Sequence, residues 1–134
     1  STFTKNTSTS QGGAVWISLE KTLNISESTF SENQSYNGGA VFASGCTVNV
    51  EDSNFNSNSA TGDSGGAIYA GTISVTGDSS FLSNTAKGNG GAIYGRVTTV
   101  NVANSVLINN SDVNGLAVYG YKTDSASPAL QQWL

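Results

Sequence analysis

Hydrophobic and polar residues alternate in several short stretches of this chain. The run Thr47-Val48-Asn49-Val50 is typical, and similar runs begin at Thr22, Thr72 and Thr99. Alternation with period two, with β-branched residues at the apolar positions, predicts strands that are buried on one face only. The 3.6-residue period of an amphipathic helix is absent from the sequence, so the pattern predicts an all-β chain.

These runs belong to a repeat of about 26 residues. An apolar residue stands near the start of each copy, and we call these equivalent positions the apolar column. Its members are separated by 27, 25, 26 and 26 residues: Phe3, Phe30, Phe55, Phe81 and Leu107. A segment such as Gly65-Gly66-Ala67-Ile68 follows eight to ten residues later in each copy. Each copy therefore predicts three short strands, near the phenylalanine, at the Ala-Ile or Ala-Val pair, and along the alternating run.

Short strands at a fixed period could form hairpins or the coils of a solenoid. Antiparallel neighbours would not bring equivalent positions of five copies into line, whereas parallel stacking of successive coils would. We therefore predict a right-handed parallel β-helix (β-solenoid) of about five coils of about 26 residues. Coils stacked about 4.8 Å apart would give a rod on the order of 24 Å long.

A single β-helix domain is expected over residues 1–134. The predicted coils are about 1–27, 28–52, 53–78, 79–104 and 105–125, and residues 126–134 are predicted to be a C-terminal lid or linker. The core should contain the phenylalanine column, the Val or Ile after each alanine, and the apolar positions of the alternating runs. Because one coil cannot close its own apolar face, stability should come from neighbouring coils.

An asparagine follows each residue of the apolar column by three positions: Asn6, Asn33, Asn58, Asn84 and Asn110. A buried amide must be hydrogen-bonded, and asparagine tolerates turn conformations. Stacked at one turn, each amide could donate to the amide of the next coil, so we predict a structural ladder rather than a catalytic or ligand-binding column. The glycine pairs are expected to mark a turn with positive φ or a close approach of two backbones.

An aromatic residue closes the Gly-Gly-Ala segment of every copy: Trp16, Phe42, Tyr69, Tyr94 and Tyr119. If Val15 and its equivalents point inward, alternation directs the preceding alanine and the following aromatic outward. That assignment predicts a strip of alanines and stacked aromatic rings along the rod, a candidate binding surface for another protomer or a glycan. The opposite assignment, with the aromatic residues buried, stays open.

Other columns suggest chemistry less strongly. Glu27, Asp52 and Asp78 recur at the repeat boundary, where stacked carboxylates would repel unless a cation intervened. We interpret them either as a weak calcium site or as an exposed turn in which Asp is favoured. The single cysteine, Cys46, has only Lys21 as a basic neighbour in register, so we interpret it as filling a small turn or edge position.

Composition narrows the possible functions. The formal net charge is −4 and the five basic residues are scattered, so nucleic acid is not an expected partner. The sequence has no apolar run of about 18 residues, so no membrane span is predicted. With no His and one Cys, zinc sites of the usual ligand types are excluded, and we expect no cofactor.

Two motifs recur as a pair, Phe-x-x-Asn followed by Gly-Gly-Ala-(Ile/Val). The four copies are Phe3/Asn6 with Gly12–Val15, Phe30/Asn33 with Gly38–Val41, Phe55/Asn58 with Gly65–Ile68, and Phe81/Asn84 with Gly90–Ile93. This pairing resembles the passenger repeats of chlamydial polymorphic outer-membrane proteins, over residues 1 to about 119. The resemblance implies a secreted, surface-displayed β-helix used in adhesion. The fifth copy departs from the motif, with Leu107 and Gly115-Leu116-Ala117.

Taken with this resemblance, the sequence predicts a non-enzymatic β-solenoid, extracellular or on the cell surface, that acts in adhesion or as a repeat module of an adhesin. The alternative is a structural subunit that stacks head to tail into an extracellular filament, because open β-helix ends expose unpaired strand edges. A polysaccharide-active enzyme and an ice-binding protein with a Thr-x-Asn face are less favoured. The expected partners are other copies or neighbouring solenoid coils, and a host receptor or glycan.

Overall fold

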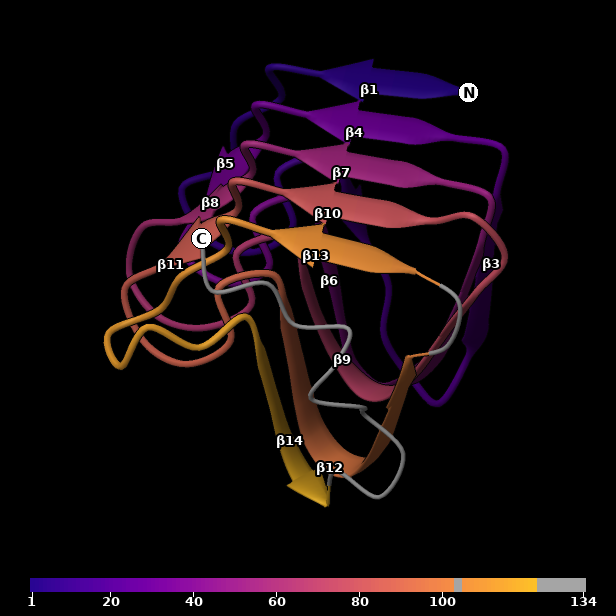
Figure 1. Ribbon diagram of the computed structural model, residues 1–134. Coiled ribbons are helices and arrows are strands. Elements are labelled where there is room, and N and C mark those ends of the chain that lie inside the picture. Colours follow the sequence, from indigo (N-terminus) through magenta and orange to yellow (C-terminus); the bar gives the residue numbers. More distant parts are fainter. Residues whose placement is uncertain (103–104, 123–134) are drawn as a thin grey trace.

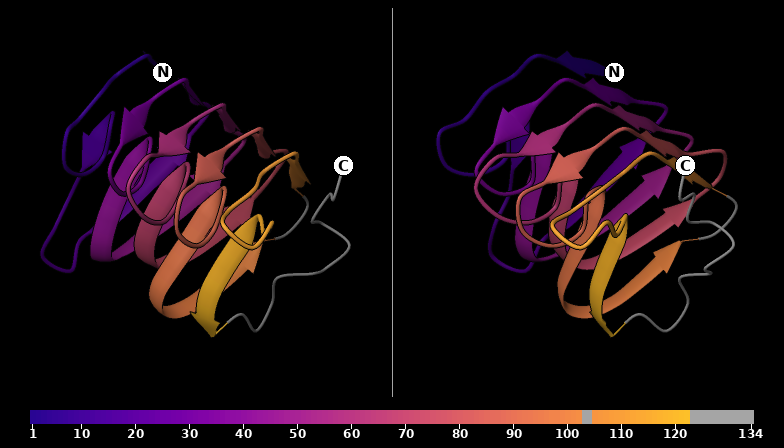
Figure 2. Two further views of the ribbon diagram at one scale, coloured as in Figure 1. Left: turned by 90° about the vertical axis from the view of Figure 1, so that its left-hand side faces the viewer. Right: turned by 60° about the vertical axis from the view of Figure 1, so that its left-hand side comes forward.

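The computed structural model describes residues 1–102 and 105–122, which form a parallel β-solenoid (Figure 1). Successive coils stack side by side along one axis, with the N-terminal coil at one end (Figure 2). All the strand pairs between coils are parallel, and the described residues contain no helix, which confirms the predicted all-β solenoid. The predicted lid or linker at 126–134 lies outside the described residues.

Three sheets run along the solenoid. The phenylalanine sheet contains β1 (Thr2–Thr4), β4 (Thr29–Ser31), β7 (Asn54–Asn56), β10 (Ser80–Leu82) and β13 (Val106–Ile108). The short sheet contains β5 (Gln34–Ser35), β8 (Ser59–Ala60) and β11 (Thr85–Ala86). The long sheet contains β2 (Val15–Trp16), β3 (Thr22–Ser26), β6 (Val41–Glu51), β9 (Ile68–Thr76), β12 (Ile93–Val102) and β14 (Val118–Lys122).

The strands of the long sheet differ from the prediction. The sequence predicts separate strands at the Ala-Val pair and along the alternating run, but β6, β9 and β12 each continue through both segments. Pairing between β6 and β9 shifts register between Ala43 and Thr47, where the number of residues differs between coils. In the first coil β2 and β3 are separate strands, and the loop between them has positive φ at Leu19 and Glu20.

Like residues lie above like residues in the phenylalanine sheet. The register pairs Phe3 with Phe30, Phe30 with Phe55, Phe55 with Phe81, and Phe81 with Leu107. The neighbouring rings stack with centroids 4.6 to 4.8 Å apart and interplanar angles of 2° to 8°. Aromatic pairs with centroids at such distances are stabilised beyond the area they bury.

The core lies between the three sheets and is closed in the middle coils. Phe55, Ile68 and Ile73 have no exposed surface. Their equivalents in the first coil, Phe3, Val15 and Leu23, are only partly buried. Burying a side chain of this size contributes about 1.5–3 kcal/mol, so each coil is stabilised mainly by the coil that covers it.

The two glycines of each pair are required for different physical reasons. Gly38 has a φ of 59°, a left-handed conformation that residues with a side chain adopt at a cost. A Cβ atom on Gly39 would instead overlap the main-chain oxygen of Gly66 and approach the backbone of Ser59, both in the next coil. The first glycine therefore makes the turn, and the second allows adjacent coils to approach.

We expect Gly39→Ala to reduce the free energy of unfolding by about 2–4 kcal/mol, because the new methyl group meets fixed backbone rather than a movable side chain. The matched control is Gly45→Ala. Gly45 has a φ of 75° and open space around its Cβ position, so only conformational strain of about 1–2 kcal/mol is expected. Urea denaturation of both variants checks this prediction, and equal losses would contradict the proposed overlap.

Candidate functional site on the outer faces

The asparagine side chains of all five coils are joined by hydrogen bonds between amides. Asn6 Nδ2 donates to Asn33 Oδ1 at 2.9 Å, Asn33 Nδ2 to Asn58 Oδ1 and Asn58 Nδ2 to Asn84 Oδ1 at 3.0 Å, and Asn84 Nδ2 to Asn110 Oδ1 at 2.8 Å. The structure therefore brings this predicted column together as one continuous chain of amides.

Each central amide of this column is fully hydrogen-bonded. Asn58 Oδ1 accepts from both the backbone N–H and the Nδ2 of Asn33, at 3.0 Å each. Asn58 Nδ2 donates to the main-chain oxygen of Phe30 as well as to Asn84, again at 3.0 Å each. An amide has two donor hydrogens and two acceptor positions, so Asn58 has no capacity left for a substrate or ligand.

A column of serines also lies partly in the interior, and it was not predicted from the sequence. The backbone N–H of Ser28 donates to Ser53 Oγ, and that of Ser53 donates to Ser79 Oγ, both at 3.1 Å. Ser53 and Ser79 are buried. The signal was present, because a serine stands two residues before the apolar column in every copy: Ser1, Ser28, Ser53, Ser79 and Ser105.

We expect Asn58→Ala to lower the free energy of unfolding by about 3–5 kcal/mol. The change removes the acceptor of the buried Asn33 backbone N–H, and one hydrogen bond each from Asn33 Nδ2, the Phe30 main-chain oxygen and Asn84 Oδ1. Asn6→Ala is the matched control at the open end of the column, where the side chain is only partly buried, and its expected loss is about 1 kcal/mol. Equilibrium denaturation measures both, and similar losses would contradict the structural role of the central amides.

The aromatic column forms a second stack, outside the apolar core cluster. Ring centroids are 4.8 Å apart between Phe42 and Tyr69, 4.7 Å between Tyr69 and Tyr94, and 5.2 Å between Tyr94 and Tyr119. Trp16 is 55% exposed and Phe42 only 8%, with the three tyrosines between these limits. The expectation of a continuously exposed strip is therefore wrong at Phe42. Since the rings cover each other's faces, the stack presents mainly ring edges.

The alanines beside this stack are also not exposed, which corrects the predicted alanine strip. Ala40, Ala67 and Ala92 have no exposed surface. The backbone N–H groups of Ala40 and Val41 both donate to the carbonyl of Ala67, at 3.0 and 2.9 Å. The chain therefore bends at the alanine, and the strand with its alternating faces begins only at the next residue.

The acidic residues at the repeat boundary do not form one stack. Glu51 pairs with Thr76, so Asp52 corresponds to Gly77, and Asp78 lies one position further along. Asp52 Oδ1 accepts the backbone N–H of Asp78 at 3.0 Å. Among the residues that the structure describes, no three His, Cys, Asp or Glu side chains are placed to hold a metal ion. Glu27, Asp52 and Asp78 are all exposed, and Glu27 and Asp52 have the positive φ of a turn.

Cys46 lies inside strand β6 and is 2% exposed. Its Sγ is 3.7 Å from the main-chain oxygen of Ser44, and its main chain packs against Gly71 of the next coil. The cysteine therefore belongs to the core, rather than to the turn or edge suggested by the sequence.

Because the Cys46 thiol is buried, we expect native protein to react with a thiol reagent at least about 100-fold more slowly than protein in urea. Timed alkylation followed by mass spectrometry measures the ratio. Ser44→Cys offers a control thiol in the same strand at a partly exposed position, and it should react quickly in both conditions. Rapid native labelling of Cys46 would show that the strand opens readily.

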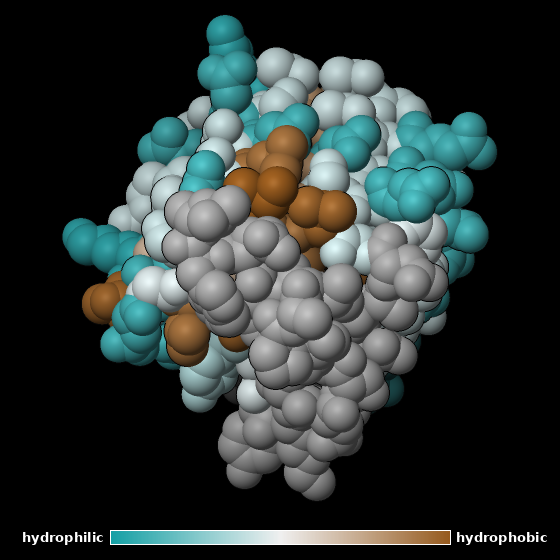
Figure 3. Space-filling model, viewed as in Figure 1, coloured by the Kyte–Doolittle hydropathy of each residue, from teal (hydrophilic) through white to brown (hydrophobic). Residues whose placement is uncertain are grey.

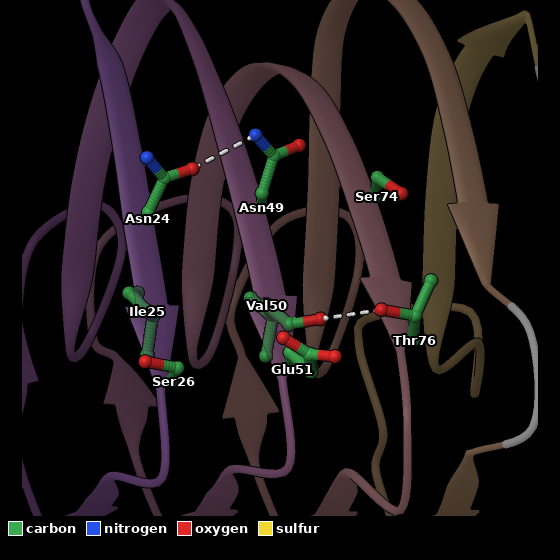
Figure 4. A pocket seen from close by; sticks show the side chains of 8 residues that line it. All are labelled: Asn24, Ile25, Ser26, Asn49, Val50, Glu51, Ser74 and Thr76. Atoms are coloured by element: carbon green, nitrogen blue, oxygen red, sulfur yellow. Dashed lines mark hydrogen bonds between the residues drawn. The ribbon is translucent and has the colours of Figure 1, made fainter.

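A shallow pocket of about 360 Å³ lies on the outer face of β3, β6 and β9 (Figure 4). Its lining residues are Asn24, Ile25, Ser26, Asn49, Val50, Glu51, Ser74 and Thr76. Asn24, Asn49 and Ser74 form one row across the three strands, and Asn49 Nδ2 donates to Asn24 Oδ1 at 3.0 Å. We call this surface the polar groove. It offers amide, hydroxyl and carboxylate groups to solvent.

A known repeat family matches four segments of this chain. Residues 1–18, 27–44, 52–71 and 78–96, together more than half of the chain, match the Chlamydia polymorphic membrane protein repeat. The chain belongs to this family. Each match includes the apolar column residue, the asparagine, the glycine pair and the closing aromatic, so the resemblance inferred from the paired motifs is confirmed.

Polymorphic membrane proteins are surface proteins, and membership implies a location at the outer membrane or cell surface. The family is not known as an enzyme family. No curated protein and no solved structure matches the chain significantly. Over residues 1–102 and 105–122, the structure contains no helix that is long and apolar enough to cross a membrane.

Proposed function

We propose that this polymorphic membrane protein module acts in adhesion, by binding a ligand through the sides of the solenoid and without catalysis. The proposal rests on a difference between the polar side chains inside the solenoid and those on its outer face. Inside, the asparagine and serine columns are occupied by hydrogen bonds between coils. Outside, the polar groove presents exposed side chains whose hydrogen bonds between coils leave some of their donors and acceptors free.

The lining of the polar groove favours a neutral, hydroxyl-rich ligand such as a glycan. The hydrogen bond between the two amides uses Asn49 Nδ2 and Asn24 Oδ1, so Asn24 Nδ2 and Asn49 Oδ1 are left as a donor and an acceptor. Ser74 and Thr76 add hydroxyl groups, and Glu51 adds a carboxylate acceptor. Paired donors and acceptors at neighbouring positions suit sugar hydroxyls, which both donate and accept.

The aromatic column is less suited to hold a sugar, although it was the first candidate from the sequence. A sugar packs against the face of an aromatic ring, and the faces of Phe42, Tyr69 and Tyr94 are covered by their neighbours. Trp16 is the most exposed member of the column, and its Nε1 donates to Gln11 Oε1 at 3.1 Å. It provides a second candidate contact at the N-terminal coil.

The proposal is tested by measuring binding of the purified chain to cultured cells and to an array of glycans. We expect saturable binding that Asn49→Ala weakens about fivefold, which corresponds to the loss of a hydrogen bond of about 1 kcal/mol. Asn54→Ala is the matched control, because Asn54 is also exposed but lies on the phenylalanine sheet.

Equal weakening by Asn49→Ala and Asn54→Ala would place the ligand elsewhere. Saturable binding that neither variant changes, but that Trp16→Ala abolishes, would move the contact to the aromatic residue. Absence of binding to every cell and glycan would contradict adhesion, and shortening of a polysaccharide substrate would favour the enzyme alternative instead.

A further inference from the structure

The Gly-Gly corners of the first three coils depend on the coil that follows. Gly38 N–H donates to the carbonyl of Ser64 and Gly39 N–H to that of Gly65, both at 3.0 Å. The equivalent N–H groups of Gly12 and Gly13 donate to Asn37 and Gly39, and those of Gly65 and Gly66 donate to Asn89 and Gly90. Two backbone donors at each of these corners therefore require a neighbouring coil on the C-terminal side.

The fifth coil satisfies the same two donors by itself. Gly115 N–H donates to the main-chain oxygen of Asp112 at 3.0 Å, and Leu116 N–H donates to Asp112 Oδ1 at 2.8 Å. Asp112 Oδ1 also accepts the N–H of Asn114 at 2.7 Å, and Asp112 Oδ2 accepts the N–H of Gly90 from the fourth coil at 2.8 Å. Asp112 thus supplies, through its main-chain oxygen and its carboxylate, the two acceptors that a following coil would otherwise supply.

Leu116 adds a steric obstacle at the same corner. It occupies the place of the second glycine, because Ala92 N–H pairs with the carbonyl of Ala117 and Ile93 pairs with Val118. At the equivalent Gly39 and Gly66, a Cβ atom would overlap main-chain atoms of the following coil. A coil added in the same register after Leu116 would meet its Cβ in the same way.

The N-terminal coil, by contrast, leaves its apolar residues partly exposed. Phe3, Val15 and Leu23 are only partly buried and line a pocket of about 300 Å³ at that end. Their equivalents one coil further on, Phe30, Val41 and Val48, are at most 2% exposed. In the second coil, the carbonyls of Gly39 and Ala40 accept hydrogen bonds from the preceding coil. The equivalent carbonyls of the first coil belong to Gly13 and Ala14.

We propose that the turn from Asp112 to Leu116 is a cap that stops further stacking, and that this solenoid accepts additional coils on its N-terminal face only. The occupant of that face is a coil with the Gly-Gly-Ala motif, because it repeats the interface already present between the first four coils. A second copy of this chain is not such an occupant, since its capped fifth coil would have to stack there. The head-to-tail filament is therefore disfavoured.

The test adds one coil to the full chain at either end. A copy of residues 53–78, marked with Ile68→Val so that its peptides differ in mass, is placed before Ser1 or after Leu134. Hydrogen exchange of the added coil is then followed by mass spectrometry.

We expect the N-terminal addition to exchange at least about tenfold more slowly than the C-terminal addition. The C-terminal addition should gain the same protection when Asp112→Ser and Leu116→Gly are introduced together, since these changes restore the ordinary corner. Asp112→Ser with Leu116→Ala is the matched control, which keeps the obstructing Cβ and should leave the added coil unprotected.

Three results would overturn the proposal. Protection of the C-terminal addition in the unmodified background would show that no cap exists, and lack of protection at the N-terminal end would show that this face does not accept a coil. Lack of protection at the C-terminal end even with the double change would show that Asp112 and Leu116 are not the obstacle. None of these results depends on whether the chain binds a glycan.

Discussion

Parallel pairing of one coil with the next is the constraint on which this molecule depends. When strands of successive coils pair in register, each residue lies one strand spacing, about 4.8 Å, from its equivalent. A side chain can occupy such a position only if it packs favourably against a copy of itself. Phenylalanine does so through its faces, asparagine by joining donor to acceptor, and the second glycine by having no side chain in the way.

The sequence predicted the parts of the fold that follow from this constraint. The nearly equal spacing of Phe30, Phe55 and Phe81 was sufficient to infer parallel coils, because antiparallel neighbours would separate them. Local bends were not predictable in the same way. Ala40 was expected outside, because alternation was extended one residue too far into a turn. Asp78 was aligned with Asp52 by counting, whereas the inserted residue displaces it from that column.

The candidate site was less predictable than the fold, and the reason is physical. Interior columns are specified by packing between coils, so they leave a strong periodic signal. The polar groove is specified only by the requirement that Asn24, Asn49 and Ser74 be polar and outward, and many residue types satisfy that requirement. Membership of the polymorphic membrane protein repeat family gives the surface location, but the chemistry of the groove comes from the geometry of strands β3, β6 and β9.

The hydrogen-bonded asparagines also give the solenoid a net dipole along its axis. Every amide in the column has its nitrogen toward the following coil and its oxygen toward the preceding one, from Asn6 to Asn110. Dipoles aligned in this way add rather than cancel, and each polarises its neighbours in a low-dielectric interior. The column therefore has a partially negative end at Asn6 and a partially positive end in the last coil. Lengthening the stack would increase this polarity with each winding.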